Sequence, residues 1–422
     1  MAWEKVKLGD VCKYVTSGGT PLASRADFYN PGTIPWLKTK EVNYSRITET
    51  ENYISELGLA NSSAKLIPAD SVIVAMYGQG DTAGRVAINK IPLCTNQACC
   101  NLVIDEKKAD FEFIYYNLCT LYNKLVSLKN GGAQPNLNAG LIKNLEISVP
   151  SLKTQKRIAD ILSAYDDLIE NNQKQIKLLE EAAQRLYKQW FIDLKFPGHE
   201  STKIVDGLPE GWKKKIVMDF ISQEIGGGWG EDDIDQKSSR PAFVIRGADI
   251  DGVNHGDFLN IPFRFHSESN LEQRILQDGD IVFEVSGGSK TEGVAKTLLI
   301  TTRLLEQYSS PVICASFCKK IRPKEGLSQY FYDALQYMRM SGVTSEYDKK
   351  SASSIVNYRW KDFLSQQCLM LPSENILRMY DKIAKPIYKS IQTKSIEIEK
   401  LKRARNSLLP KLMSGEIEVS HV

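Results

Sequence analysis

The sequence predicts an α+β protein in which two globular α/β domains are separated by two long helices. We expect these helices to pair as an antiparallel coiled coil, so that the chain is a pseudo-two-fold internal duplication. Three observations lead to this prediction. Two long segments carry apolar residues at alternating steps of three and four, a mixed strand-and-helix pattern precedes each segment, and short motifs of the first half recur in order in the second half.

The first long helix is predicted over residues 154–193. Its apolar or small residues recur at the spacing that keeps one narrow face turned to a partner helix. They are Ile158, Ile161, Tyr165, Leu168, Leu179, Ala182 and Leu186. Polar Asn172 falls in the same series, and a polar residue in such a face costs stability but fixes register. The pattern therefore indicates a specific partner helix.

A matching segment near the C-terminus is the predicted partner. Its apolar series is Ile383, Ile387, Ile391, Ile398, Leu401, Leu408 and Leu412. When Leu179 is aligned with Leu401, Asn172 falls on Lys394, so both series are interrupted at the same point. We expect Asn172 and Lys394 to meet near the pseudo-two-fold axis and to set the register of the pair. The second segment is basic and the first slightly acidic, which favours their pairing. Pro410 predicts an end or a kink in the second helix.

The segment before the first long helix reads as a compact α+β domain. Apolar runs at 72–77, 85–88 and 98–104 predict strands, and the run at 145–150 predicts a short closing strand. Residues 111–128 have helical periodicity.

The second half repeats this domain. Trp212 begins a stretch that resembles the one at Trp3, the glycines at 226–228 match Ser17-Gly-Gly19, and Asp280 aligns with Asp70. The predicted boundaries are 1–150 for the first domain, 151–195 for the central helix, 196–211 for a linker, 212–372 for the second domain and 373–422 for the distal helix and tail.

Composition limits the function classes. The 422 residues are 42% hydrophobic and 25% charged, and no apolar run reaches the length of a transmembrane helix. We expect a cytoplasmic protein without a membrane segment, with reduced and mostly buried cysteines and with no metal site. The net charge of +3 does not by itself argue for nucleic acid. The chain has neither a P-loop nor the Asn/Asp-Pro-Pro-aromatic motif of base methyltransferases, so we expect a protein that is not an enzyme.

Two domains held apart by paired helices fit two functions equally well. A fixed spacer between two heads could read a split, asymmetric DNA site, because half-sites lie a set number of helical turns apart. The alternative is a pseudo-symmetric scaffold that bridges two proteins and does not bind DNA.

Several motifs in a fixed order resemble one known family. They are Ser17-Gly-Gly-Thr-Pro21, Gly131-Gly-Ala-Gln-Pro-Asn-Leu-Asn138, Arg185-Leu-Tyr-Lys-Gln-Trp-Phe-Ile-Asp193 and Ser407-Leu-Leu-Pro-Lys-Leu-Met-Ser-Gly-Glu-Ile417. This set resembles the specificity (HsdS) subunit of type I restriction–modification systems. The second domain departs from the pattern, because Gly228-Trp-Gly230 replaces Gly-Thr-Pro and Lys350-Ser-Ala-Ser-Ser354 replaces the Gln-Pro-Asn loop.

The resemblance implies two target-recognition domains that read a bipartite site on double-stranded DNA. It also implies a complex with two methyltransferase subunits and two restriction subunits. S-adenosylmethionine, ATP and magnesium are then expected on those partners, and no cofactor on this chain.

The residues expected at the DNA lie on loops or strand ends, where members of this family vary their specificity. Arginine suits guanine, asparagine and glutamine suit adenine, and lysine suits phosphate. In the first domain they are Lys38, Lys40, Tyr77, Gln79, Arg85, Gln134, Asn136 and Asn138. In the second domain they are Trp229, Arg246, Ser289, Lys290, Lys349, Lys350, Ser353 and Tyr358. At the end of the central helix, Tyr187, Trp190 and Phe191 either pack on the neighbouring domain or contact the methyltransferase.

Overall fold

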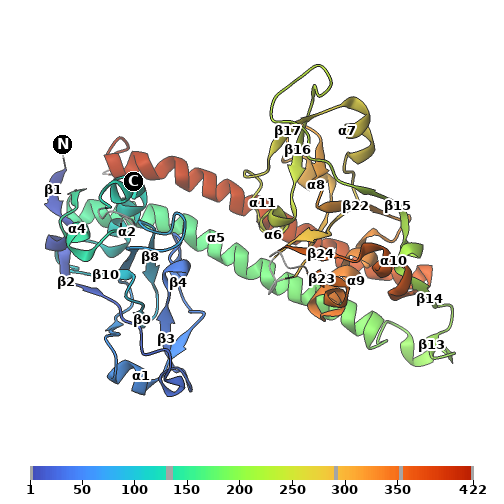
Figure 1. Cartoon of the computed structure of the whole chain (residues 1–422), viewed down its shortest axis with the longest axis horizontal. Coiled ribbons are helices and arrows are strands. Elements are labelled where there is room, and N and C mark those ends of the chain that lie inside the picture. The colour runs from blue at the N-terminus through green and yellow to red at the C-terminus, as the bar shows by residue number, and fades with distance from the viewer. Residues whose placement is uncertain (1–2, 130–135, 289–292, 351–354, 420–422) are drawn as a thin grey trace. The chain divides into compact units, whose positions relative to one another are not determined.

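The computed structural model describes residues 3–129, 136–288, 293–350 and 355–419. The chain forms two compact units. Unit 1 contains residues 1–167 and 403–422, and unit 2 contains residues 168–402. Each unit therefore combines one globular domain with parts of both long helices, α5 (Leu152–Tyr187) and α11 (Glu374–Ser414). Figure 1 shows the two long helices in green and red.

Unit 1 is built from small, mostly antiparallel sheets. Its main sheet has the order β2-β10-β7-β8-β4, a second sheet has the order β5-β3-β9-β6, and β1 pairs with β11. The strands are β1 (Glu4–Lys7), β2 (Cys12–Ser17), β3 (Ile34–Leu37), β4 (Arg46–Ile47), β5 (Tyr53–Ile54), β6 (Leu66–Ile67), β7 (Val72–Ala75), β8 (Val86–Asn89), β9 (Leu93–Thr95), β10 (Cys99–Ile104) and β11 (Glu146–Val149). The helices are α1 (Glu56–Ala60), α2 (Phe111–Thr120), α3 (Tyr122–Ser127) and α4 (Ala139–Lys143). In Figure 1, α1 lies at the opposite end of this unit from α2 and α4.

The predicted elements of this domain are confirmed. The apolar runs become β7, β8, β10 and β11, and the helical stretch becomes α2 followed by α3. Every residue of β7 and β10 is buried, as expected for central strands of continuous apolar sequence. Helix α2 begins where it does because the Asp110 carboxylate accepts a hydrogen bond from the Phe113 amide at 2.9 Å.

Unit 2 contains the counterpart of each of these sheets. β14 pairs with β25, and the further sheets have the orders β15-β22-β18-β20, β17-β16-β21 and β19-β24-β23. The strands are β12 (Ile204–Val205), β13 (Leu208–Pro209), β14 (Lys213–Ile216), β15 (Ile221–Gly226), β16 (Arg240–Ile245), β17 (Phe263–His266), β18 (Ile281–Glu284), β19 (Ser286–Gly287), β20 (Thr297–Leu299), β21 (Val312–Cys314), β22 (Cys318–Pro323), β23 (Asp348–Lys350), β24 (Val356–Tyr358) and β25 (Cys368–Leu371). The helices are α6 (Ile250–Asn254), α7 (Glu268–Arg274), α8 (Thr302–Leu305), α9 (Ser328–Met340) and α10 (Trp360–Gln366).

The glycine motif shared by the two halves has a structural reason. A Cβ atom on Gly18 would lie 2.2 Å from the carbonyl oxygen of Thr95, and one on Gly227 would lie 2.1 Å from that of Ala315. Both glycines follow equivalent strands, β2 and β15, which pair with β10 and β22. The close backbone approach therefore excludes any side chain at either position.

One step of the predicted alignment is wrong by one residue. The left-handed position after β6 is Asp70, with φ of 61°, and its counterpart is Gly279, with φ of 84°. The amide of Asp70 donates to Asn89 and that of Gly279 to Ile300, so Asp70 corresponds to Gly279 and not to Asp280.

The long helices bury a face that differs partly from the predicted one. Leu168 is 48% exposed and Ile383 is 44% exposed. The buried face of α5 instead runs one residue further along, through Leu162, Asp166, Ile169, Asn172, Ile176, Ala183 and Tyr187. In unit 2, Ile169 and Ile176 of α5 cluster with Ile391 and Ile398 of α11. In unit 1, the start of α5 contacts the end of α11 through an Asp166–Arg405 ion pair. The earlier part of α5 thus contacts the later part of α11, and the later part of α5 contacts an earlier part of α11, as in an antiparallel pair.

The residues expected to fix the helix register lie at different depths. Asn172 is buried at 5% exposure, whereas Lys394 is half-buried beside Ser395, which is buried. Their direct pairing stays a prediction. The distal helix is assigned through Pro410 to Ser414, so it does not end at the proline. Proline lacks the amide of one i→i−4 hydrogen bond, and here this loss falls near the end of the helix.

The aromatic residues at the end of α5 belong to the core of unit 2. Tyr187, Trp190 and Phe191 are each at most 4% exposed. Phe191 contacts the rings of Tyr330 and Tyr380 with centroid distances of 4.8 Å. Of the two alternatives, packing on the neighbouring domain is therefore observed. The predicted linker is also anchored, because Phe196 is buried and its ring lies 5.0 Å from that of Trp212.

Two further expectations concern the whole chain. The eight cysteines are free, and six of them are buried. Within the described ranges, no helix is both long and apolar enough to cross a membrane.

Candidate nucleic-acid interface

In each domain, a basic residue directly follows one strand of a parallel pair. Lys38 comes directly after β3, and its amide donates to Glu41 at 3.0 Å across a single turn. Arg246 comes directly after β16, and its amide donates to Asp249 at 2.9 Å across an equivalent turn. β3 pairs in parallel with β9, and β16 with β21. Lys38 and Arg246 therefore have the same local geometry in the two domains.

Each of these cations is held by its neighbours. The ammonium of Lys38 donates to Asn52 at 3.1 Å and lies 5.1 Å from the ring centroid of Trp36. The guanidinium of Arg246 makes two hydrogen bonds with Asp249, at 2.8 and 2.7 Å. Lys40 is exposed and forms an ion pair with Glu51. An ordered cation at a strand end can meet a base edge or a phosphate without first losing much side-chain entropy.

The loop after β7 contains three further predicted residues, and one of them contacts the segment that follows Lys38 and Lys40. Gln79 is exposed and Tyr77 half-buried, and burial raises the pKa of the Tyr77 hydroxyl. Arg85 donates to Asn43 at 2.9 Å and forms an ion pair with Asp81. Because Asn43 follows the turn that contains Lys40, the two loops meet on one face of unit 1.

The predicted asparagines lie beside the same loop. The amide of Leu137 donates to the carbonyl of Met76 at 3.1 Å, which places exposed Asn136 next to Tyr77. Asn138 is also exposed, and its side-chain oxygen accepts from Leu141 at 2.9 Å, so it caps α4. Gln134 lies outside the described residues. Unit 1 thus gathers the described members of the predicted set around the 76–85 loop.

Tyr358 does not belong to this surface in the second domain. Its amide donates to Val285 at 2.9 Å, the same contact that Leu137 makes with Met76. Tyr358 therefore occupies the position of a buried leucine, and it is 8% exposed, with its ring 5.3 Å from that of Phe283. This burial argues against a DNA contact.

The remaining predicted residues of the second domain are only partly described. Lys349 is exposed on β23. Lys350 continues that strand, but its side chain is not among the described parts. Ser289, Lys290 and Ser353 lie outside the described residues. Their role stays a prediction.

The structural match between the domains adds two residues that sequence reasoning missed. Asn357 precedes Tyr358 as Asn136 precedes Leu137, and it is exposed on β24, where its side chain accepts from the Ser286 hydroxyl at 2.8 Å. Lys296 follows Ala295 as Arg85 follows Gly84, and it forms an ion pair with Asp251 at 2.8 Å. Ala295 even shares the left-handed backbone of Gly84, with φ of 72° against 94°. Apolar and polar residues alternate in Val356-Asn357-Tyr358, which is typical of a strand with one exposed face. This alternation is the signal in the sequence that could have placed Asn357 on the surface.

Trp229 and Arg246 line an open cavity of about 500 Å³ in unit 2. Glu284, Ser286, Lys296 and Phe317 contribute to its walls, together with Gly247, Ala248, Gly287, Gly288, Ala315 and Ser316. This cavity lies at the place in unit 2 that matches the Lys38 and Arg85 loops of unit 1.

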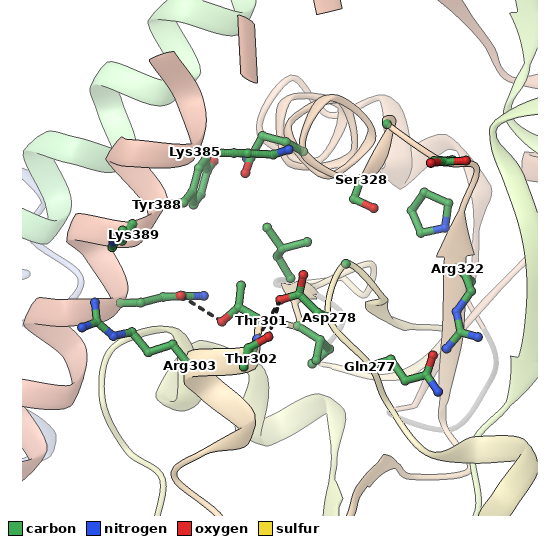
Figure 2. Close-up of a pocket in the computed structure, with 18 of the residues that line it drawn as sticks. Gln277, Asp278, Thr301, Thr302, Arg303, Arg322, Ser328, Lys385, Tyr388 and Lys389 are labelled. Carbon is green, nitrogen blue, oxygen red and sulfur yellow. Dashed lines mark hydrogen bonds between the residues drawn. The ribbon is translucent and has the colours of Figure 1, made fainter. Parts of the chain in front are cut away.

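A second and larger hollow, of about 1250 Å³, lies between the α8 segment, the end of β22 and α11 (Figure 2). Many of its polar groups already have partners. Thr301 donates to Gln392 at 2.9 Å, Thr302 donates to Asp278, and Arg322 is bidentate to Asp280. None of the predicted contact residues lines it. We therefore place the candidate interface at the first cavity.

Comparison with known proteins identifies the class. Residues 2–181 match the model of the type I restriction modification DNA specificity domain. The type I restriction enzyme MjaIX specificity subunit of Methanocaldococcus jannaschii is 27% identical over 100% of this chain and 94% of its own length. The HindI specificity subunit of Haemophilus influenzae is 23% identical over 98% of this chain and 99% of its own.

A solved structure shows the same fold. The crystal structure of the type I restriction-modification S subunit from M. genitalium covers 97% of this chain and 96% of its own, with a TM-score of 0.59 at 16% identity. Over its whole length the chain is therefore similar to type I restriction–modification specificity subunits, and its first 181 residues carry the DNA specificity domain.

Proposed function

We propose that this chain is the DNA sequence-specificity subunit of a type I restriction–modification complex. Each target-recognition domain reads one half of a bipartite, asymmetric site on double-stranded DNA, and the long helices set the spacing between the halves. The chain docks two methyltransferase subunits and two restriction subunits, and it acts in the cytoplasm.

The repeated polar surface carries this proposal. A basic residue after the parallel strand, a second basic residue on the return strand and an exposed asparagine occur in both units, as Lys38, Arg85 and Asn136 and as Arg246, Lys296 and Asn357. Cationic and amide side chains are those that contact phosphates and base edges. Because these two basic residues and one asparagine occur once in each domain, each domain can contact its own part of the DNA. The DNA site would then consist of two parts.

The chain itself supplies recognition and no catalysis. S-adenosylmethionine, ATP and magnesium then bind to the partner subunits. The function of the remaining predicted residues, including Lys40, Gln79 and Lys349, is to contact phosphates and bases at the edges of each surface.

The test is single-molecule sequencing of methylated bases in cells that carry this chain with its cognate methyltransferase, compared with cells that lack the chain. We expect a split motif that disappears with the deletion. An unchanged methylation pattern in an otherwise active system would contradict the proposal and favour a scaffold. In that case, the affinity of the complex for DNA should also lack the loss of about three decades between 50 and 200 mM salt that many phosphate contacts produce.

A further inference from the structure

The cavity beside Arg246 has a buried carboxyl group on its wall. Glu284, the last residue of β18, is 2% exposed. Gly247 packs against it so closely that a Cβ there would lie 2.4 Å from Oε1 of Glu284. The backbone is therefore shaped to make room for this carboxyl group.

One oxygen of this carboxyl group is buried without a hydrogen-bond partner in the described part of the chain. Among the described residues, Oε2 of Glu284 is buried and accepts no hydrogen bond. Burial raises the pKa of the Glu284 carboxyl, and the charge and backbone amide of Lys296 offset only part of this effect. A buried acceptor without a partner costs free energy unless a ligand satisfies it.

Two aromatic side chains form exposed walls of the same cavity. Trp229 is 39% exposed and Phe317 is 58% exposed. The guanidinium of Arg264 lies 4.4 Å from the ring centroid of Trp229. Aromatic faces around a hydrogen-bonding group are what a planar heterocycle requires, since stacking and a polar edge contact can act together.

These features are specific to the second domain. Glu284 occupies the position of Ala75, because the Glu284 carbonyl accepts from Ala295 and the Ala75 carbonyl accepts from Gly84. Phe317 occupies the position of Ala98, since their carbonyls accept from Val285 and Met76 respectively. Three large or charged residues of this cavity thus replace the small Ala75, Ala98 and Thr20. Because all three replacements lie around the same cavity, they indicate that this cavity binds a ligand that the first domain does not bind.

Resting on the proposed function, we propose that this cavity receives one unstacked, amino-bearing base of the second half-site, with Glu284 accepting a hydrogen bond from its exocyclic amino group. Cytosine, adenine and guanine each carry such a donor, and a carboxylate matches it. Trp229 and Phe317 then contact the faces of the base. A base that remained stacked in the duplex could not reach a group as deep as Glu284.

The first test uses the complete complex in cells and maps the methylated motif. Glu284→Met removes the acceptor at nearly constant volume, and Glu272→Met, an exposed site on α7, is the matched control. We expect Glu284→Met to relax one position of the second half-site by about tenfold, since a good base contact discriminates by roughly 1–3 kcal/mol. The base specified at that position before the substitution shows which of these three bases enters the cavity. The first half-site and the Glu272→Met motif should not change.

Variants at two exposed residues distinguish the loss of a base contact from a folding defect. If Glu284→Met lowers the unfolding temperature, Trp229→Ala and Phe317→Ala decide the question, and both should relax the same position. A wild-type motif that none of the three variants alters overturns this inference and leaves the proposed function intact. The absence of any motif with the wild-type chain instead removes the proposed function itself. An unchanged motif with weaker methyltransferase binding would assign the cavity to a basic side chain of that subunit and overturn the inference.

A second measurement reports unstacking directly. A duplex with 2-aminopurine at the mapped position should become more fluorescent when the wild-type complex binds, and less so with Trp229→Ala. A duplex with the probe one base pair away is the control. Equal fluorescence at both positions would contradict insertion of the base.

Discussion

At the scale of single residues, this chain contains buried polar groups whose partners are tyrosines. Asp333 is fully buried in unit 2, and its carboxylate accepts hydrogen bonds from Tyr380 at 2.7 Å and from Gln329 at 3.1 Å. Burial raises the pKa of Asp333 to about 7, while Tyr388, Tyr380 and Gln329 lower it in part and the charge of Asp381 raises it slightly. A neutral carboxyl group is therefore favoured in the folded state.

This pKa predicts the pH dependence of stability. An unfolded aspartate titrates near pH 4, so the folded chain keeps a proton that the unfolded chain loses between about pH 4 and 7. The contribution of Asp333 is fully present below this window and is lost as the pH rises through it. Asp333→Asn is neutral throughout, so its stability relative to the wild type should rise by about 2–3 kcal/mol from pH 5 to pH 8. Urea unfolding followed by tryptophan fluorescence measures this difference, and a constant difference would contradict the raised pKa.

The shared glycines give a second prediction at this scale. Gly18→Ala and Gly227→Ala force a Cβ against a backbone carbonyl, so each should destabilise its domain by about 2–4 kcal/mol. Gly226→Ala is the matched control, because no atom lies within 4 Å of a Cβ built there. Thermal unfolding of the three variants checks the expectation. A loss as large in Gly226→Ala would show that the close approach is not the cause.

At the scale of elements, the long helices contact each other in unit 1 through apolar residues and through an ion pair between a buried aspartate and a partly buried arginine. Asp166 is 8% exposed, pairs with Arg405 and accepts a hydrogen bond from Tyr116 at 2.5 Å. Removal of one member of such a pair leaves the other buried without compensation.

The corresponding prediction is a double-mutant cycle. Arg405→Met should cost about 3 kcal/mol, whereas Asp166→Asn combined with Arg405→Met should recover much of that loss. Arg378→Met is the control, because its partner Glu374 and Arg378 itself are mostly exposed, and it should cost less than about 1 kcal/mol. Equilibrium unfolding in urea gives the coupling energy. A coupling near zero would mean that apolar packing alone holds the helices in this unit.

The elements also show what the sequence can and cannot predict. Short, mainly apolar runs such as 72–75 and 99–104 favour buried strands, because they are too short for a typical helix. The helix face was ambiguous because Ile161-Leu162, Leu168-Ile169 and Ala182-Ala183 are adjacent pairs, and either member satisfies steps of three and four. Only contact with the partner helix selects the second member. Lys38 and Arg246 can be matched from the sequence because each directly follows a strand. Glu284 gives no such signal, because it is the last residue of an otherwise apolar strand. Asn357 gives none either, because the loop before it differs in sequence from the corresponding loop of the first domain.

At the scale of the whole molecule, the two units share an arrangement of strands but differ in the side chains at the candidate interface. Both units place a basic residue directly after one strand of a parallel pair, and in unit 2 the cavity beside this residue also has Glu284 on its wall. The unit boundaries fall inside α5 and α11, so each unit includes parts of both long helices. Changes in one domain should therefore alter one half-site only.

This independence can be tested with the equivalent cations. Lys38→Ala should weaken or relax the first half-site, and Arg246→Ala the second, because each residue occupies the same position in its own domain. Each loss should either relax one base position by about tenfold or reduce the salt dependence of DNA binding by about one phosphate contact. Methylated-motif mapping and affinities of the complete complex between 50 and 200 mM salt separate these outcomes, with Lys13→Ala and Lys237→Ala as exposed controls. If either cation variant altered both half-sites equally, the two domains would not read DNA independently, and the bipartite reading of this chain would have to be replaced by a single composite site.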